Sequence, residues 1–128
     1  MERRLVFSGN PYEGIWGHSR AVRVGNHISV SGTAPIPADG SDPPGDAYEQ
    51  TRLCLQIILA ALAEIGSRAE DVVRTRVYGT SADIFDEVAR AHHEVFGRIS
   101  PASAFVVIKE LANPAWLVEI EADAIATA

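Results

Sequence analysis

The chain has 128 residues, of which 47% are hydrophobic, and its formal net charge is −6. These values indicate one folded domain over residues 1–128 with a sizeable core, and they exclude a disordered composition. The acidic balance argues against a nucleic-acid partner, because nucleic-acid-binding domains usually carry a basic patch. A single cysteine, Cys54, rules out an intramolecular disulfide and favours a reducing, cytoplasmic location. We expect no signal peptide and no membrane association, because the longest apolar run, residues 57–63, is far too short to span a bilayer.

Short β-strands are predicted for the first third of the chain. Residues 3–8 are a weak candidate, and residues 20–24 and 27–32 flank a Gly-Asn pair in the way that is typical of a hairpin. Residues 34–45 contain four prolines and two glycines. This segment is predicted to be a loop, because proline fixes φ and removes hydrogen-bond donors.

A helix is predicted to begin at Asp46, with Glu49 three positions later completing a capping box. Apolar residues then recur at helical spacing until Gly66, the expected C-terminal stop. The next segment, residues 71–80, is rich in β-branched residues and is predicted to be a strand.

The last third of the chain predicts a second helix and two more strands. Ser81 can cap a helix over residues 82–96, which carries apolar residues along one side. Strands are expected over about residues 104–109 and 117–125. The order βββαβαββ predicts an α+β two-layer sandwich, with a mixed sheet and two helices on one face. The other face of that sheet must contact water or other subunits.

Three acidic residues alternate along the last predicted strand, in the segment LVEIEADAIATA. A strand sends successive side chains to opposite faces, so Glu119, Glu121 and Asp123 share one face. Arg74 and Arg76 also share one face of their strand, and they can pair with the acids if the strands are neighbours. Judged from the residues alone, this structural pairing is the favoured interpretation of the acidic row.

Other reactive residue types have structural interpretations. Adjacent His92 and His93 point in different directions from a helix, so they are poor joint metal ligands, and one packed and one solvated ring is the favoured interpretation. Cys54 falls on the apolar stripe of the first predicted helix and is expected to be buried and unreactive. Tyr48 and Tyr78 are expected to be partly buried packing residues.

Five segments together resemble the RidA/YjgF/UK family, whose older name is endoribonuclease L-PSP. They are residues 16–36 (WGHSRAVRVGNHISVSGTAPI), the helix that begins at Asp46, and residues 70–97 (with DVVRTRVYG), 100–111 (SPASAFVVIKEL) and 117–126 (LVEIEADAIA). The resemblance implies a chorismate-mutase-like protomer in a homotrimer, with ligand clefts between subunits. It also implies hydrolysis of enamines and imines to 2-oxo acids and ammonia, without a metal or an organic cofactor.

The resemblance also implies a set of site residues. The family's catalytic arginine follows a Pro-Ala pair, where this chain has Ser103, and the cysteine or threonine two positions later is Phe105. The family's tyrosine falls at His18, the glycine of its VSG turn is Gly32, and its water-positioning glutamate is Glu119. This chain is therefore expected to be a divergent member that lacks the deaminase arginine.

The leading hypothesis is a trimer that binds a small metabolite and hydrolyses or tautomerises an enamine or imine, with Glu119 and His18 as catalytic residues. The expected substrate-binding residues are Ser103, Phe105, Gly32, Trp16 and, as a substitute for the missing cation, Arg20. One alternative is a ligand-binding or regulatory trimer without catalysis. A weaker alternative is an endoribonuclease, which the acidic charge disfavours.

Overall fold

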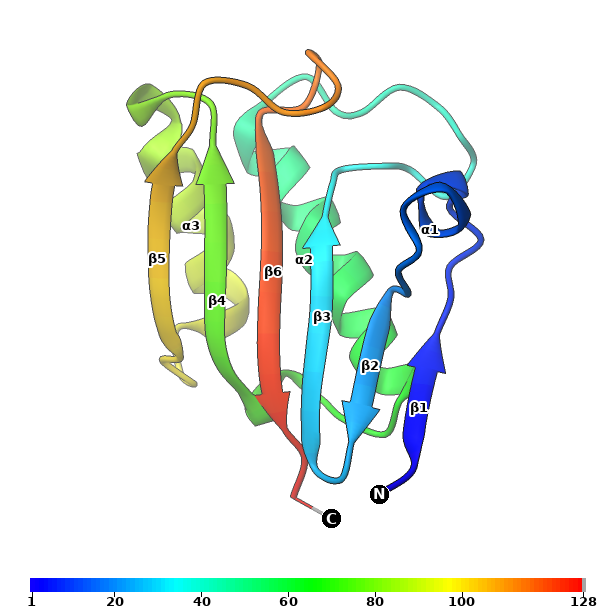
Figure 1. The fold of residues 1–128 in the computed structure, drawn as a ribbon. Coiled ribbons are helices and arrows are strands. Elements are labelled where there is room, and N and C mark those ends of the chain that lie inside the picture. The colour runs from blue at the N-terminus through cyan, green and yellow to red at the C-terminus, as the bar shows by residue number, and fades with distance from the viewer. Residues whose placement is uncertain (128) are drawn as a thin grey trace.

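The computed structural model describes residues 1–127 as one six-stranded sheet with two helices packed on one side (Figure 1). The strands are β1 (Arg3–Val6), β2 (Ala21–Val24), β3 (His27–Thr33), β4 (Val72–Gly79), β5 (Ala102–Val107) and β6 (Val118–Ile125). Their order in the sheet is β1-β2-β3-β6-β4-β5, and the β4–β5 pair is parallel while the other pairs are antiparallel. The predicted α+β two-layer fold is confirmed.

The first long helix, α2 (Ala47–Glu64), forms where its capping box predicts it. The Asp46 carboxylate accepts a hydrogen bond of 2.8 Å from the Glu49 backbone N–H, which satisfies a donor that the first turn leaves free. The face that packs on the sheet buries Leu55, Ile58 and Leu62 almost completely. Burial of such side chains contributes about 1.5–3 kcal/mol each.

The second long helix, α3 (Phe85–Phe96), begins later than predicted. Ser81 does cap the segment, since its Oγ accepts a hydrogen bond of 3.0 Å from the Asp83 N–H. The first turn, Ala82–Ile84, is however a separate 3₁₀ turn. Such turns often precede α-helices, and this one changes the boundary without changing the fold.

A short helix, α1 (Pro11–Trp16), is absent from the predicted order βββαβαββ. Asn10 caps it by accepting a hydrogen bond of 2.8 Å from Tyr12 N–H, and Pro11 occupies the first position, where proline has no donor to lose. Gly17 ends the helix in the left-handed conformation, with φ of 86°. The sequence carried these signals in the segment NPYEGIWG, but a helix of six residues has no apolar periodicity to reveal it.

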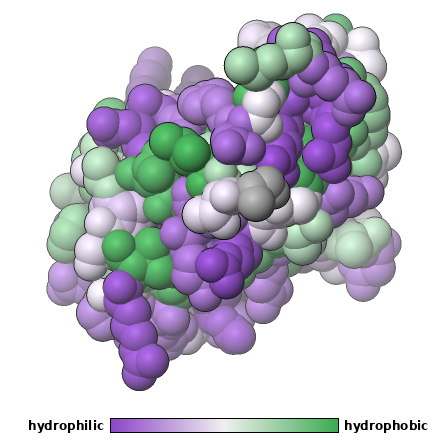
Figure 2. Space-filling view, turned by 90° about the horizontal axis from the view of Figure 1, so that it is seen from below, coloured by the Kyte–Doolittle hydropathy of each residue, from purple (hydrophilic) through white to green (hydrophobic). Residues whose placement is uncertain are grey.

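Helices α2 and α3 lie behind the sheet in Figure 1, and the face toward the viewer is uncovered. Val118 and Ile120 lie on the helix side and are fully buried, so they do not belong to the open face. The open face instead exposes apolar side chains at both margins of the sheet, namely Leu5, Val24 and Val106. In Figure 2, which views the molecule from below, hydrophobic areas are broken up by hydrophilic residues.

The pairing of β3 with β6 contains an irregularity that positions the candidate site. Val30 pairs with Ala122, but the next pair is Thr33 with Ile120, so three residue steps on β3 match two on β6. This is the geometry of a β-bulge, which bends a strand locally and redirects side chains.

None of the helices within residues 1–127 is long and apolar enough to cross a membrane.

Candidate functional site

A carboxylate lies over the bulge of β3. Glu119, on β6, points to the open face of the sheet and is half-buried. A Cβ atom built at Gly32 would lie only 2.5 Å from Glu119 Oε2. Glycine at position 32 therefore provides the space that the carboxylate occupies, and a larger residue would displace it.

The bulge itself is held by Arg20. The Arg20 Nη2 atom donates hydrogen bonds to Ser31 O at 2.6 Å, Gly32 O at 2.9 Å and Thr33 Oγ1 at 2.8 Å. The whole residue is buried, with 7% of its surface exposed. Arg20 was expected to bind the ligand as a substitute for the missing cation. In the protomer its Nη2 atom is engaged with the loop under Glu119, while its Nε atom is buried without a recorded hydrogen-bond partner among residues 1–127.

The electrostatic surroundings favour the neutral form of Glu119. Burial raises the pKa of the Glu119 carboxyl group, the positive charge of Arg20 opposes that rise, and the nearby Glu121 adds to it. A carboxylate with a raised pKa is a better proton acceptor than an ordinary surface glutamate. Among residues 1–127 the structure records no hydrogen bond or ion pair that would engage Glu119.

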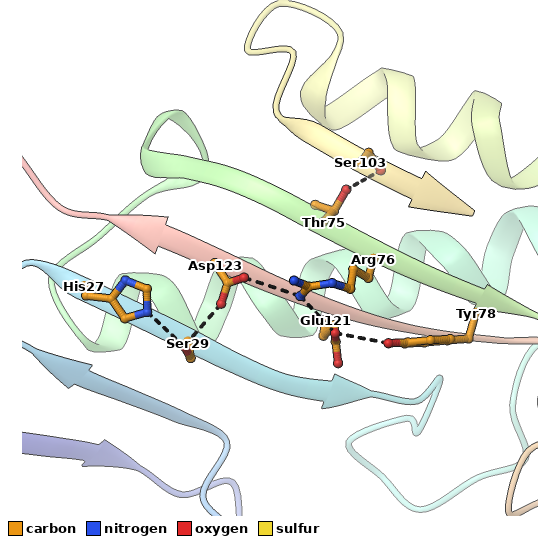
Figure 3. Close-up of polar contacts among 8 residues, drawn as sticks. All are labelled: His27, Ser29, Thr75, Arg76, Tyr78, Ser103, Glu121 and Asp123. Atoms are coloured by element: carbon orange, nitrogen blue, oxygen red, sulfur yellow. Dashed lines mark hydrogen bonds and ion pairs between the residues drawn. The ribbon is translucent and has the colours of Figure 1, made fainter. Parts of the chain in front are cut away.

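The other two acids of the row are engaged, as Figure 3 shows. Arg76 Nη1 lies 3.1 Å from Glu121 Oε1 and 3.5 Å from Asp123 Oδ2, and the Tyr78 hydroxyl donates to Glu121 at 3.1 Å. Burial and Glu121 raise the pKa of Tyr78, which keeps it a hydrogen-bond donor. The predicted cross-strand pairing is confirmed for Arg76, whereas no ion pair of Arg74 is recorded in the described part of the chain. Glu119 therefore differs from Glu121 and Asp123 in having no recorded hydrogen-bond or ion-pair partner among residues 1–127.

Two of the expected ligand residues lie on the other side of the sheet. Ser103 and Phe105 are on the edge strand β5, opposite Thr75 and Val77 of β4, whose side chains point to the helices. Phe105 packs edge-to-face against Phe85, with ring centroids 5.4 Å apart. A single protomer therefore does not bring these two residues together with Glu119.

The remaining expected residues lie before β2. His18 follows α1, and its Nδ1 atom is buried without a hydrogen-bond partner in residues 1–127. Trp16, the last residue of α1, is 82% exposed, so its side chain does not enclose a ligand site within the protomer. No contact between either residue and Glu119 is recorded among the described residues.

The structural interpretations of the other reactive residues hold. Cys54 is fully buried, and burial, with Glu119 nearby, raises the pKa of its thiol, so it is a poor nucleophile. His92 is half-buried while His93 is exposed. Within residues 1–127 no group of three or more His, Cys, Asp or Glu side chains is arranged to hold a metal ion.

Known proteins share this fold and sequence along almost the whole chain. The endoribonuclease L-PSP family model matches residues 10–126. A RutC family protein of Pyrococcus abyssi is 34% identical over 123 residues, or 95% of this chain and 96% of that protein. A protein of Streptomyces coelicolor is 36% identical over 121 residues, or 94% of this chain and 90% of that protein.

A crystal structure from Mycobacterium tuberculosis, of a member of the YjgF/YER057c/UK114 family, matches with a TM-score of 0.90. It is 40% identical to this chain, and the match covers 98% of this chain and 100% of that one. The chain belongs to the YjgF/RutC family. For this YjgF-family chain, the resemblance noted in the sequence is confirmed at the level of family and fold.

The sequence did not reveal one polar contact in the YjgF-family protomer. Ser103 Oγ lies 2.7 Å from Thr75 Oγ1, which lies 2.8 Å from His92 Nε2 (the Ser103–Thr75 pair is drawn in Figure 3). Thr75 is fully buried among apolar residues of β4. Alternation along the strand places Thr75 and Val77 on the helix side of β4, and a threonine buried there requires a hydrogen-bond partner. This requirement is the only indication of the contact that the sequence offers.

Proposed function

We propose that this YjgF-family protein is a homotrimer that binds a small metabolite in clefts between subunits and hydrolyses its enamine or imine group. One observation supports the proposal most strongly. Glu119 is a half-buried carboxylate with a raised pKa, held over a glycine at a bulge, while the two acids beside it are engaged by Arg76 and Tyr78. Proteins keep such a group free of partners mainly where it acts on a ligand.

The position of β5 supports a site completed by a second copy. Ser103 and Glu119 point to opposite faces of one sheet, and β5 is an edge strand with mostly exposed residues. A neighbouring subunit that packs against this edge would bring its own Glu119 to Ser103 and Phe105. The trimer is part of this proposal, since ligand contacts then come from two chains.

The chemistry requires only a base and a water molecule. Glu119 takes a proton from water while the oxygen attacks the imine carbon. That proton passes to nitrogen to give a carbinolamine, the proton of the added hydroxyl group then passes to nitrogen as the C–N bond breaks, and ammonia and a 2-oxo acid leave. His18 is the proposed second proton donor or acceptor, and Trp16 and Phe105 would line the apolar wall. No metal or organic cofactor takes part in this scheme.

The proposed activity can be tested with 2-iminopropionate produced in place by an amino-acid oxidase. We expect slow ammonia release by the wild type, because Ser103 offers one neutral hydrogen bond where an arginine would form two charged ones. Such a contact contributes about 1.5–3 kcal/mol. Ser103→Arg should therefore accelerate hydrolysis by roughly tenfold to a hundredfold. A folded Ser103→Arg variant without any gain would contradict the proposed place of Ser103 in the site.

Assembly is tested by sedimentation equilibrium. We expect a mass of about three times the chain mass of 13.8 kDa, because the open sheet face and the β5 edge expose apolar side chains that need a covering layer. A stable monomer at micromolar concentration would rule out an inter-subunit cleft.

The alternative of a binding protein without catalysis is favoured by the serine at position 103. Ammonia release that stays at the uncatalysed rate, together with measurable ligand binding, would support this alternative. The weaker alternative, an endoribonuclease, rests on the name of the family model and is opposed by the net charge of −6. Cytoplasmic location also remains a proposal, which rests on the single, reduced Cys54.

A further inference from the structure

The short helix α1 reverses the usual pattern of a surface helix. Among its six residues only Glu13 is buried, with 6% of its surface exposed. The apolar side chains face outward instead, since Ile15 and Trp16 are each 82% exposed and Tyr12 is 47% exposed. Surface helices normally bury an apolar stripe and expose their charges. Apolar burial therefore contributes little to holding α1 on the domain, and polar contacts must do so.

The carboxylate of Glu13 supplies these polar contacts. Its two oxygens accept hydrogen bonds from the Ser8 N–H, at 3.2 and 3.1 Å, and Oε1 also accepts from the Gly9 N–H at 3.3 Å. The Ser8 hydroxyl donates a further hydrogen bond of 2.5 Å to Oε2. Hydrogen bonds to a charged acceptor are about twice as strong as neutral ones. A helix of six residues is unstable by itself in water, so these bonds fix α1 to the segment that follows β1.

The backbone of Glu13 holds the other end of the same segment. Its carbonyl oxygen accepts hydrogen bonds from the Gly17 N–H at 2.9 Å and from the His18 N–H at 3.1 Å. The Nδ1 atom of His18 is buried without a recorded partner among residues 1–127, so no hydrogen bond at this nitrogen orients the ring in the protomer. The placement of His18 therefore depends on the backbone that Glu13 holds.

We propose that Glu13 is a positioning residue, which ties residues 8–9 to residues 17–18 and thereby places the His18 imidazole for proton transfer in the proposed site. The inference rests on the proposed function for the role of His18. It goes beyond that function by adding a buried carboxylate that acts only through His18.

The surroundings keep the Glu13 carboxyl group ionised. Burial opposes ionisation, but the hydrogen bonds from Ser8 and Gly9 and the positive charge of Arg20 outweigh it and lower the pKa of Glu13. An ionised carboxylate only accepts hydrogen bonds, which matches the three donor groups that Ser8 and Gly9 direct at it. Glutamine keeps the size of the side chain but turns an NH2 group toward these donors. Glu13→Gln therefore breaks the contact without creating a cavity.

The first test measures amide hydrogen exchange by NMR. In Glu13→Gln, we expect the Gly17 and His18 amides to exchange about tenfold faster than in the wild type and the His18 ring signals to shift. Ser8→Ala, at an exposed position, removes one donor to the carboxylate and should change the same signals in the same direction by about twofold to threefold. It serves if Glu13→Gln does not fold. Asn10→Ala is the matched control, since it removes only the hydrogen bond that caps the same helix, and it should change these signals far less.

The second test separates positioning from general stability through turnover. We expect Glu13→Gln to lower kcat for imine hydrolysis by about tenfold with KM nearly unchanged, because proton transfer by a misplaced imidazole is slower. The double variant Glu13→Gln/His18→Gln should be no slower than His18→Gln, since Glu13 acts only through His18. A role in stability alone would lower the rate by the same factor with and without the His18 imidazole.

Three results would overturn the inference. The first is unchanged exchange of the Gly17 and His18 amides in a folded Glu13→Gln variant. The second is an equal effect of Asn10→Ala, because the change would then belong to the helix and not to the carboxylate. The third is an equal loss of rate in both His18 backgrounds. If the wild type releases no ammonia, the proposed hydrolase fails, and amide exchange still decides whether Glu13 places His18.

Discussion

Replacing Glu119 by glutamine should reduce imine hydrolysis by about a hundredfold or more, because the amide cannot accept the proton of the attacking water. The substitution keeps the shape of the side chain, so its fit over Gly32 is preserved. Steady-state ammonia release by the purified variant measures the effect. An active Glu119→Gln variant would remove the proposed base from the mechanism.

The same variant should unfold at nearly the same denaturant concentration as the wild type. Burial raises the folded-state pKa of Glu119 above its unfolded value, so its contribution to the free energy of unfolding is largest at low pH and is lost as pH rises through the folded pKa. Glutamine does not titrate, so the free energy of unfolding of the variant does not fall at this position as pH rises. At neutral pH the variant should therefore be at least as stable as the wild type, and urea unfolding at neutral and mildly acidic pH checks the sign.

Glu121→Gln is the matched control, since it changes the next acid of the same row. Glu121 accepts hydrogen bonds from Arg76 and Tyr78, so its loss should alter stability by up to about 1 kcal/mol and leave ammonia release unchanged. If both variants lose activity alike, the row acts as a charged surface and Glu119 has no separate role.

Replacing Arg20 by methionine should lower the free energy of unfolding by about 3 kcal/mol. The change leaves two backbone carbonyls and the Thr33 hydroxyl without their charged donor in a buried position. For a chain of this size, we expect the melting temperature to fall by roughly 10 °C. Loss of the nearby positive charge should also raise the Glu119 pKa further.

Arg76→Met provides the comparison for this prediction. Arg76 is partly exposed and pairs with Glu121 and Asp123 at the sheet surface, where ion pairs contribute at most about 1 kcal/mol. Thermal unfolding of both variants should show a much larger shift for Arg20→Met. Equal shifts would mean that the bulge does not depend on the Arg20 guanidinium.

Local signals in the sequence predicted most of the fold. The Asp46 N-cap, the hairpin at Gly25 and the alternation in β6 are each set by a few neighbouring residues, and the structure contains all three, although no reciprocal hydrogen bond from Glu49 to Asp46 is recorded among residues 1–127. Helix α1 was missed because it has a cap and a stop but is too short for periodicity. The start of α3 was displaced because a Ser81 cap is compatible with either a 3₁₀ or an α turn.

The site was harder to predict because its contacts join residues that are distant in the sequence. Alternation placed Glu119 on the same face of the sheet as Glu121 and Asp123. The sequence alone could not show that Gly32 makes room for Glu119 or that Arg20 donates a hydrogen bond to the Gly32 carbonyl. Both facts depend on the bulge in β3, which breaks the two-residue period. The link from Ser103 through Thr75 likewise depends on the parallel pairing of β4 with β5.

The place of β6 in the sheet has a consequence for how the protein is made. This strand follows all the others in the sequence, yet it lies between β3 and β4 and joins the two halves of the sheet (Figure 1). During synthesis, β1-β2-β3 and β4-β5 leave the ribosome first, with open edges where β6 will insert. Folding of the complete domain must wait for the residues of β6, and the nascent chain should depend on chaperones until then.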